Sequence, residues 1–159
     1  SIKAERATNK SKRIQFLNEN SIPCAQFRHV KNKNELMIKG QEIGFPLVIK
    51  PIDNAGARGV RLVENENQLI EAYDEAVNYS VIKEVLLEEV LSGQEISTES
   101  IIYNGEITTF AFADRNYNKK EIFAPYFIED GINFPSNLSD ELKQKVLDLV
   151  EKTIRCLEI

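Results

Sequence analysis

The sequence predicts an α+β fold that combines helices with mainly antiparallel strands. Two short apolar runs, 47–50 and 60–63, flank a loop of small residues and indicate neighbouring strands. Farther along, Asn104-Gly105 separates two alternating runs, which is the strongest short-range signal for a hairpin. From Ser139 onward, apolar residues recur at helical spacing, which indicates an amphipathic helix.

The composition is that of an ordinary globular chain and limits the classes of function. The 159 residues suffice for one domain or for two small lobes that share a core. The net charge of -5 argues against a nucleic-acid partner, and no stretch approaches the roughly 20 apolar residues of a membrane span. Two cysteines and one histidine supply neither a disulfide framework nor a zinc site. With no secretory leader at the start, we expect a cytoplasmic protein.

The first third of the chain is predicted to hold two helices. Residues 8–19 form a short amphipathic helix with Asn9 as its cap. A second helix covers 35–43 and is stopped by Gly44. The single histidine, His29, is expected to cap or pack, because no nearby pattern supplies an orienting carboxylate and a nucleophile.

Lys50 ends a buried strand, and the functional interpretation depends on this lysine. The run Leu47-Val48-Ile49 lies between two prolines, which limit the strand in both directions. A lysine that leaves an apolar strand needs an anion or a carboxylate, because an unpaired buried ammonium is costly or changes its pKa. A phosphate is one such partner.

The loop that follows, residues 53–59, is built from small residues and contains Gly56 and Gly59. The two glycines allow backbone conformations in which N–H groups converge on oxygen anions. The loop matches neither a Walker loop nor a Rossmann fingerprint. An ordinary hairpin with a mobile tip is the alternative, because glycine-rich loops are common in turns.

The next elements are a helix capped by Asn65 and a strand over 85–91. That strand carries Glu88 and Glu89 near its end, and paired glutamates at such a position are most often a solvated edge. A turn at 92–95 then leads into the hairpin.

The remainder of the chain is predicted to hold the hairpin strands 96–103 and 107–113, a loop-rich region and the last helix. Glu99 is expected to be a surface cross-strand partner, and Arg115 is expected to form an ion pair at the rim. A short extended piece is expected at 126–128. The helix from Ser139 must bury its apolar face against a sheet.

The order of strand, Lys-Pro, small-residue loop and Gly-Val strand resembles the ATP-grasp superfamily, and the resemblance covers almost the whole chain. The run Glu-Glu-Val-Leu-Ser-Gly-Gln-Glu at 88–95 is similar to the hinge of D-alanine:D-alanine ligases and their relatives. The resemblance implies two small α+β lobes with mainly antiparallel sheets around a nucleotide cleft. It implies a leading helix and connector over 1–30, the smaller lobe over 31–91, and an incomplete larger lobe over 92–159.

The resemblance also implies which residues contact ATP. Lys50 and the glycine-rich loop hold the phosphates, and Lys10 reaches them from the first helix, although Asn9 replaces the usual aspartate of the family. On spacing alone, a solvated surface charge is the better interpretation of Lys10. At the hinge, backbone groups around Glu88, Glu89 and Leu91 read the adenine edge, and Glu88 lies beside the adenine amine. The last glutamate, Glu95, takes the ribose hydroxyls. The complete expected set is Lys10, Lys50, Asp53, Gly56, Arg58, Gly59, Glu88, Glu89, Leu91 and Glu95.

The activity that the resemblance implies is that of an ADP-forming ligase, which activates a carboxylate as an acylphosphate for attack by an amine. Two rivals stay open: a carbamoyl phosphate synthetase or biotin carboxylase type that phosphorylates bicarbonate, and a non-catalytic ATP-binding module. The family also uses Mg2+, held by an acid and a Glu-x-Asn pair, and no Glu-x-Asn occurs in these 159 residues. We therefore expect the metal ligands beyond residue 159, in the remainder of a parent polypeptide, and no turnover by this chain alone.

Overall fold

The computed structural model describes residues 8–158, and the chain divides into two compact units. The first unit extends to Leu91 and includes Lys120–Ile128, and the second comprises Ser92–Lys119 and the residues from Glu129 onward. Within the described part of the chain, no helix is both long and apolar enough to cross a membrane.

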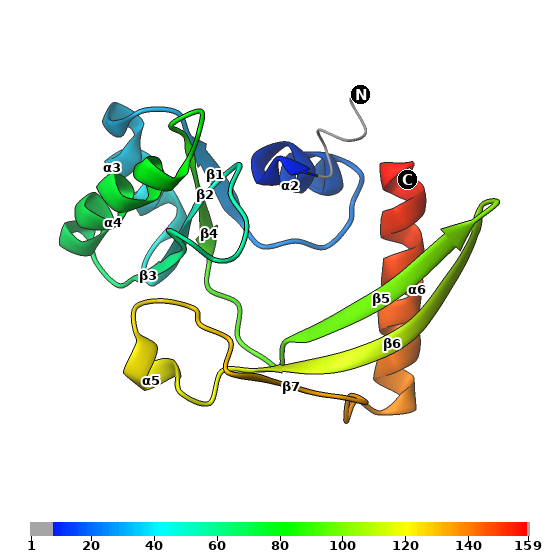
Figure 1. Ribbon diagram of the computed structural model, residues 1–159. Coiled ribbons are helices and arrows are strands. Elements are labelled where there is room, and N and C mark those ends of the chain that lie inside the picture. Colours follow the sequence, from blue (N-terminus) through cyan, green and yellow to red (C-terminus); the bar gives the residue numbers. More distant parts are fainter. Residues whose placement is uncertain (1–7, 159) are drawn as a thin grey trace. The chain divides into compact units, whose positions relative to one another are not determined.

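A four-stranded antiparallel sheet forms the centre of the first unit (Figure 1). Its strands, in spatial order, are β1 (Phe27–Val30), β4 (Val85–Glu89), β2 (Leu47–Pro51) and β3 (Arg61–Val63). The sequence analysis predicted β2, β3 and β4 but missed β1. Arg28 and His29 give β1 a half-buried pattern that carries no apolar run.

Two helices, α3 (Lys33–Ile43) and α4 (Glu66–Tyr79), cover one face of this sheet and form the core with it (Figure 1). Asn65 caps α4 as predicted, and its side chain accepts a hydrogen bond from Gln68 N at 3.1 Å. The fully buried members of the core are Val30, Leu36, Leu47, Ile49, Val63, Leu69, Ala72, Ala76, Val85 and Leu87.

The first helix, α2 (Lys10–Glu19), begins beside the end of β2. Asn9 caps it by accepting a hydrogen bond from Lys12 N at 3.0 Å, which confirms the predicted cap. The backbone N–H of Lys10 donates to the carbonyl oxygen of Ile52 at 2.9 Å. The start of the helix is therefore tied to the residues that lead into the glycine-rich loop.

A segment from late in the chain also belongs to the first unit. It contains the short helix α5 (Lys120–Phe123) and runs along the free edge of β3. Leu62 N donates to Pro125 O at 2.8 Å, and Tyr126 forms an isolated bridge with Arg61. The extended piece predicted at 126–128 is thus reduced to a single bridge at Tyr126.

The second unit consists of a three-stranded antiparallel sheet and a helix. β5 (Ile96–Tyr103) and β6 (Glu106–Asn116) form the predicted hairpin, β7 (Gly131–Asn133) pairs with β6, and α6 (Asp140–Leu157) follows. The expectation that α6 buries its apolar face is met only in part among the described residues, because Val146, Val150 and Ile154 are half-buried. Leu157 is its only buried residue, and Leu142 stays 46% exposed.

The burial of the sheet predicts which leucine the fold needs. Leu87 is fully buried between β1 and β2, so Leu87→Ala should lower the free energy of unfolding of the first unit by about 2–5 kcal/mol. Ile38→Ala is the matched control, because Ile38 is 64% exposed on α3, and its effect should stay within about 0.5 kcal/mol. Urea denaturation of both variants measures this, and equal losses would contradict the assigned core.

Candidate functional site

Lys50 lies on the face of the sheet opposite to α3 and α4. Side chains alternate between the two faces of a strand, and Leu47 and Ile49 of β2 point into the helix-covered core. Lys50 therefore points to the other face. Cross-strand pairing places Leu86 of β4 beside Lys50 on one side and beside His29 of β1 on the other.

The ammonium of Lys50 forms an ion pair with the carboxylate of Glu88. The side chains are 27% and 15% exposed, so water screens the pair only partly. The sequence left both a phosphate and a carboxylate open as partners for Lys50. The structure supplies a carboxylate from β4, because Glu88 lies two residues after Leu86, the residue that pairs with Lys50. Glu88, expected beside an adenine amine, thus holds Lys50.

Helix α2 carries Lys10 to the same region. Its ammonium donates to the carbonyl oxygen of Asn54, at the start of the glycine-rich loop, although the two residues are 44 positions apart in sequence. Burial lowers the pKa of Lys10, and the charges of Arg13 and Lys50 lower it further, against the opposite effect of Asp53 and Glu88. Lys10 is therefore no isolated surface charge.

The loop itself takes a conformation that depends on glycine. Gly56 and Gly59 have φ values of 73° and 72°, in the left-handed region. The side chain of Asn54 accepts hydrogen bonds from Ala55 N at 2.8 Å and from Arg58 Nη2 at 3.1 Å. The exposed Arg58 is thus folded back onto the first half of its own loop.

Asp53 opens the loop and is bonded to a distant turn. Its carboxylate accepts hydrogen bonds from Val81 N at 3.1 Å and from Ile82 N at 3.1 Å. Burial acts to raise the pKa of Asp53, but hydrogen bonds from Ser80 and from these two N–H groups outweigh it and hold that pKa below its ordinary value. The carboxylate therefore stays ionised at neutral pH.

The hinge residues Glu89 and Leu91 differ in their surroundings. The carboxylate of Glu89 accepts from Gln26 N at 2.7 Å, and the N–H of Glu89 donates to Gln26 O at 3.0 Å. Both groups of Glu89 are thus engaged with the connector that precedes β1. Leu91 is 69% exposed.

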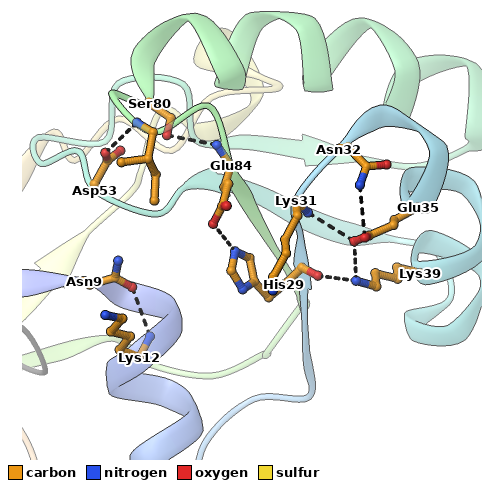
Figure 2. A network of polar contacts seen from close by, with 11 residues as sticks. Asn9, Lys12, His29, Lys31, Asn32, Glu35, Lys39, Asp53, Ser80 and Glu84 are labelled. Atoms are coloured by element: carbon orange, nitrogen blue, oxygen red, sulfur yellow. Dashed lines mark hydrogen bonds and ion pairs between the residues drawn. The ribbon is translucent and has the colours of Figure 1, made fainter.

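His29 lies beside a carboxylate that the sequence did not indicate. Its Nε2 atom is 2.7 Å from Glu84 Oε2, and both side chains are about three-quarters buried (Figure 2). Glu84 directly precedes β4, 55 positions away in sequence. His29 thus packs against β4 and has a carboxylate as its hydrogen-bond partner. Only the pairing of β1 with β4 brings the two residues together.

Glu95 belongs to the second unit, where it precedes β5. Its carbonyl oxygen accepts from Arg115 N at 2.9 Å. Burial raises the pKa of Tyr117, and the charge of Glu95 and a hydrogen bond to it act in the same direction. Arg115 itself donates from Nε to Glu129 at 2.9 Å, so the ion pair expected of it has Glu129 as its partner.

Within residues 8–158, no three His, Cys, Asp or Glu side chains come together in a way that could hold a metal ion. The described residues thus do not by themselves form a Mg2+ site.

The structure brings together, in the first unit, Lys10, Lys50, Glu88 and the start of the loop. Sequence reasoning missed the roles of Asn54, Glu84 and Ser80. A polar residue in a turn or loop gives no sign in the sequence of which distant hydrogen-bonding group it will meet.

Comparison with known proteins identifies the family of this chain. Residues 8–122 match the family described as phosphoribosylglycinamide synthetase, ATP-grasp (A) domain. The chain belongs to the ATP-grasp family. The predicted family and the predicted α+β class are thereby confirmed.

Individual ATP-grasp relatives extend the comparison. The formate-dependent phosphoribosylglycinamide formyltransferase of Prochlorococcus marinus (strain NATL1A) is 37% identical over 106 residues, which make up 67% of this chain and 25% of that protein. The crystal structure of the ADP complex of purK, an N5-carboxyaminoimidazole ribonucleotide synthetase, has a TM-score of 0.78 at 22% identity and covers 96% of this chain and 38% of its own. D-alanyl-alanine synthetase A from Vibrio cholerae O1 biovar eltor has a TM-score of 0.80 at 15% identity, with 98% and 48% covered.

The two structural likenesses show the ATP-grasp fold alone, because both identities are below 25%. The chain spans between 25% and 48% of the length of these three proteins. It therefore corresponds to a part of each of them.

The loop geometry predicts that its two glycines differ in importance. In both positions an alanine would be strained by about 1–2 kcal/mol, because φ is positive. At Gly59 the added Cβ would also lie 2.8 Å from the Tyr79 ring and 2.9 Å from Pro51, whereas at Gly56 it would meet nothing within 4 Å. Gly59→Ala should therefore lower the melting temperature clearly more than Gly56→Ala, and the reverse order would contradict this loop packing.

Proposed function

We propose that this chain is the ATP-binding portion of an ADP-forming ligase that activates a carboxylate as an acylphosphate for attack by an amine. One observation carries the proposal. Helix α2 brings the ammonium of Lys10 onto the glycine-rich loop at Asn54, close enough to Lys50 for the two charges to interact. Binding a triphosphate requires groups that neutralise its charge and hold its oxygens, and two lysines and the backbone N–H groups of a glycine-rich loop can do so.

The phosphate contacts follow from the partners of these lysines. Lys10 donates to a neutral carbonyl oxygen, and a phosphate oxygen is a stronger acceptor for an ammonium because it is charged. Lys50 is held at the sheet surface by Glu88 and presents its remaining N–H bonds from there. Gly56 and Gly59 let the loop N–H groups turn toward the same oxygens.

We place the base and ribose at the hinge. Backbone groups around Glu89 and Leu91, other than the Glu89 N–H that is bonded to Gln26, would read the adenine edge. Glu88 would lie near the adenine amine, and Glu95 would accept the ribose hydroxyls. The segment 31–91 would form the smaller lobe, 92–159 part of the larger one, and 1–30 the leading helix and connector. The solved purK relative, described as an ADP complex, supports nucleotide binding by this fold.

A carboxylate substrate is supported by the names of two relatives. One is formate-dependent, and formate is a carboxylate; another makes D-alanyl-alanine, which joins a carboxylate to an amine. A bicarbonate-phosphorylating enzyme would instead show bicarbonate-stimulated ATP hydrolysis by the complete protein. Absence of turnover with any carboxylate or with bicarbonate would favour a non-catalytic ATP-binding module.

The metal ion and the cellular location complete the proposal. We propose that Mg2+ accompanies ATP and that its ligands lie beyond residue 159, in the remainder of the parent polypeptide. We also retain the cytoplasm as the proposed location, with no nucleic-acid or membrane partner.

Lys50 and Glu95 give the direct test on this chain. Lys50→Ala removes a charge-assisted contact to phosphate and should weaken ATP binding about 10- to 100-fold while sparing adenosine. Glu95→Ala should weaken adenosine as well as ATP, because it removes the ribose acceptor. Lys33→Ala is the control, since Lys33 pairs with Asp74 on the exposed surface, and it should bind like the wild type. If isothermal titration finds both site variants unchanged, the site is wrong.

The lowered pKa of Lys10 predicts proton uptake on binding. At about pH 9.5, just below the ordinary lysine pKa, part of Lys10 is uncharged in the free chain, and a bound phosphate would favour its charged form. ATP binding should therefore take up more protons at this pH than at pH 7, because the uncharged fraction of the lysine falls as the pH falls. Calorimetry in two buffers of different ionisation enthalpy measures the uptake. Lys10→Met should reduce it, and an undiminished uptake in that variant would contradict the phosphate contact.

A further inference from the structure

Both ends of the glycine-rich loop rest on one segment, residues 79–84. At the start of the loop, Asp53 accepts hydrogen bonds from Val81 N and Ile82 N. At its end, Gly59 packs so closely on Tyr79 that a Cβ would lie 2.8 Å from the tyrosine ring. The middle of the loop, 55–58, is exposed. A loop with fixed ends and an exposed middle keeps its position while its middle stays open to solvent and to a ligand.

The turn that receives Asp53 is itself held by side chains (Figure 2). Ser80 is 1% exposed, and its Oγ accepts from Glu84 N at 3.2 Å while it also hydrogen-bonds Asp53. On the far side, the Glu84 carboxylate lies 2.7 Å from His29 Nε2, which ties the end of the turn to β1. The turn is therefore a fixed support and not a mobile connection.

Asp53 is an unexpected residue to find beside a phosphate-binding loop, because two anions repel each other. Its oxygens face three donors of the turn, so the negative charge is satisfied within the chain. The charge of Asp53 also acts on Lys10 by favouring its ammonium form. Such an arrangement fits a residue that positions the loop and not one that touches phosphate.

We propose that Asp53 and Ser80 are positioning residues that seat the phosphate-binding loop on the 80–84 turn. This inference rests on the proposed function for the role of the loop, but not for the contacts that hold it. In this proposal the carboxylate of Asp53 binds backbone groups of its own chain, whereas the family resemblance implied that Asp53 contacts the nucleotide. Loss of either residue should weaken binding of the phosphate part of ATP and should not change binding of the adenosine part.

The test compares Asp53→Asn, Ser80→Ala and the control Asp74→Asn in this chain. Asp74 is an acid on α4 that pairs with Lys33 at 2.7 Å on the exposed surface. Amide hydrogen exchange is measured without nucleotide over 54–58 and 80–82, and the affinities for ATP and for adenosine are measured by titration. Asparagine offers one acceptor in place of a carboxylate, so the loop should exchange about tenfold faster and ATP should bind about tenfold more weakly. Adenosine affinity should stay within about twofold.

Ser80→Ala keeps the test decisive if Asp53→Asn fails to fold, and it should change exchange and ATP binding in the same direction. Weaker ATP binding with unchanged exchange would overturn the inference, because Asp53 would then act by direct contact. Equal losses of ATP and adenosine, or effects no larger than those of Asp74→Asn, would also overturn it. If the wild-type chain binds no ATP, the proposed function fails, and the exchange rates alone decide whether the turn seats the loop.

Discussion

The site depends on two ammonium groups held at one half-buried face of a small sheet. Charges at such a face are screened less than in water and must each have a partner. Lys50 finds Glu88 on the next strand, and Lys10 finds the carbonyl oxygen of Asn54. These two contacts connect β2, β4, α2 and the glycine-rich loop. The sheet, with its apolar face covered by α3 and α4, gives them a rigid base.

The loop combines an open middle with fixed ends. Gly56 has open space around it, whereas Gly59 touches Tyr79 and Pro51. Asp53 is bonded to the 80–84 turn, which Ser80 and the Glu84–His29 pair support. A phosphate-binding loop needs N–H groups that point toward oxygen anions and that keep their position. In this chain the glycines allow the backbone conformation that directs these groups, and the packed ends of the loop hold its position.

Local signals predicted the elements well where one residue type decides the geometry. Asn9, Asn65 and Ser139 cap their helices, and Asn104-Gly105 forms the hairpin turn with positive φ at both positions. The sequence failed at β1, which has too little apolar character to stand out. It also overstated the burial of α6, whose apolar face is mostly half-buried in the described residues, with only Leu157 buried. In both cases burial depends on neighbours that are distant in sequence.

By itself, the sequence determined the α+β class, the ATP-grasp family, the lysine at the end of β2 and the glycines of the loop. These features are set by residues within a few positions of one another, because turns, caps and strand ends are local. Only the tertiary structure decided that Lys50 meets Glu88, 38 positions away, and that Lys10 reaches Asn54. It likewise decided that Asp53 is bound to the backbone of its own chain. Such pairings follow from strand order and register, which the hydrophobic core fixes as a whole.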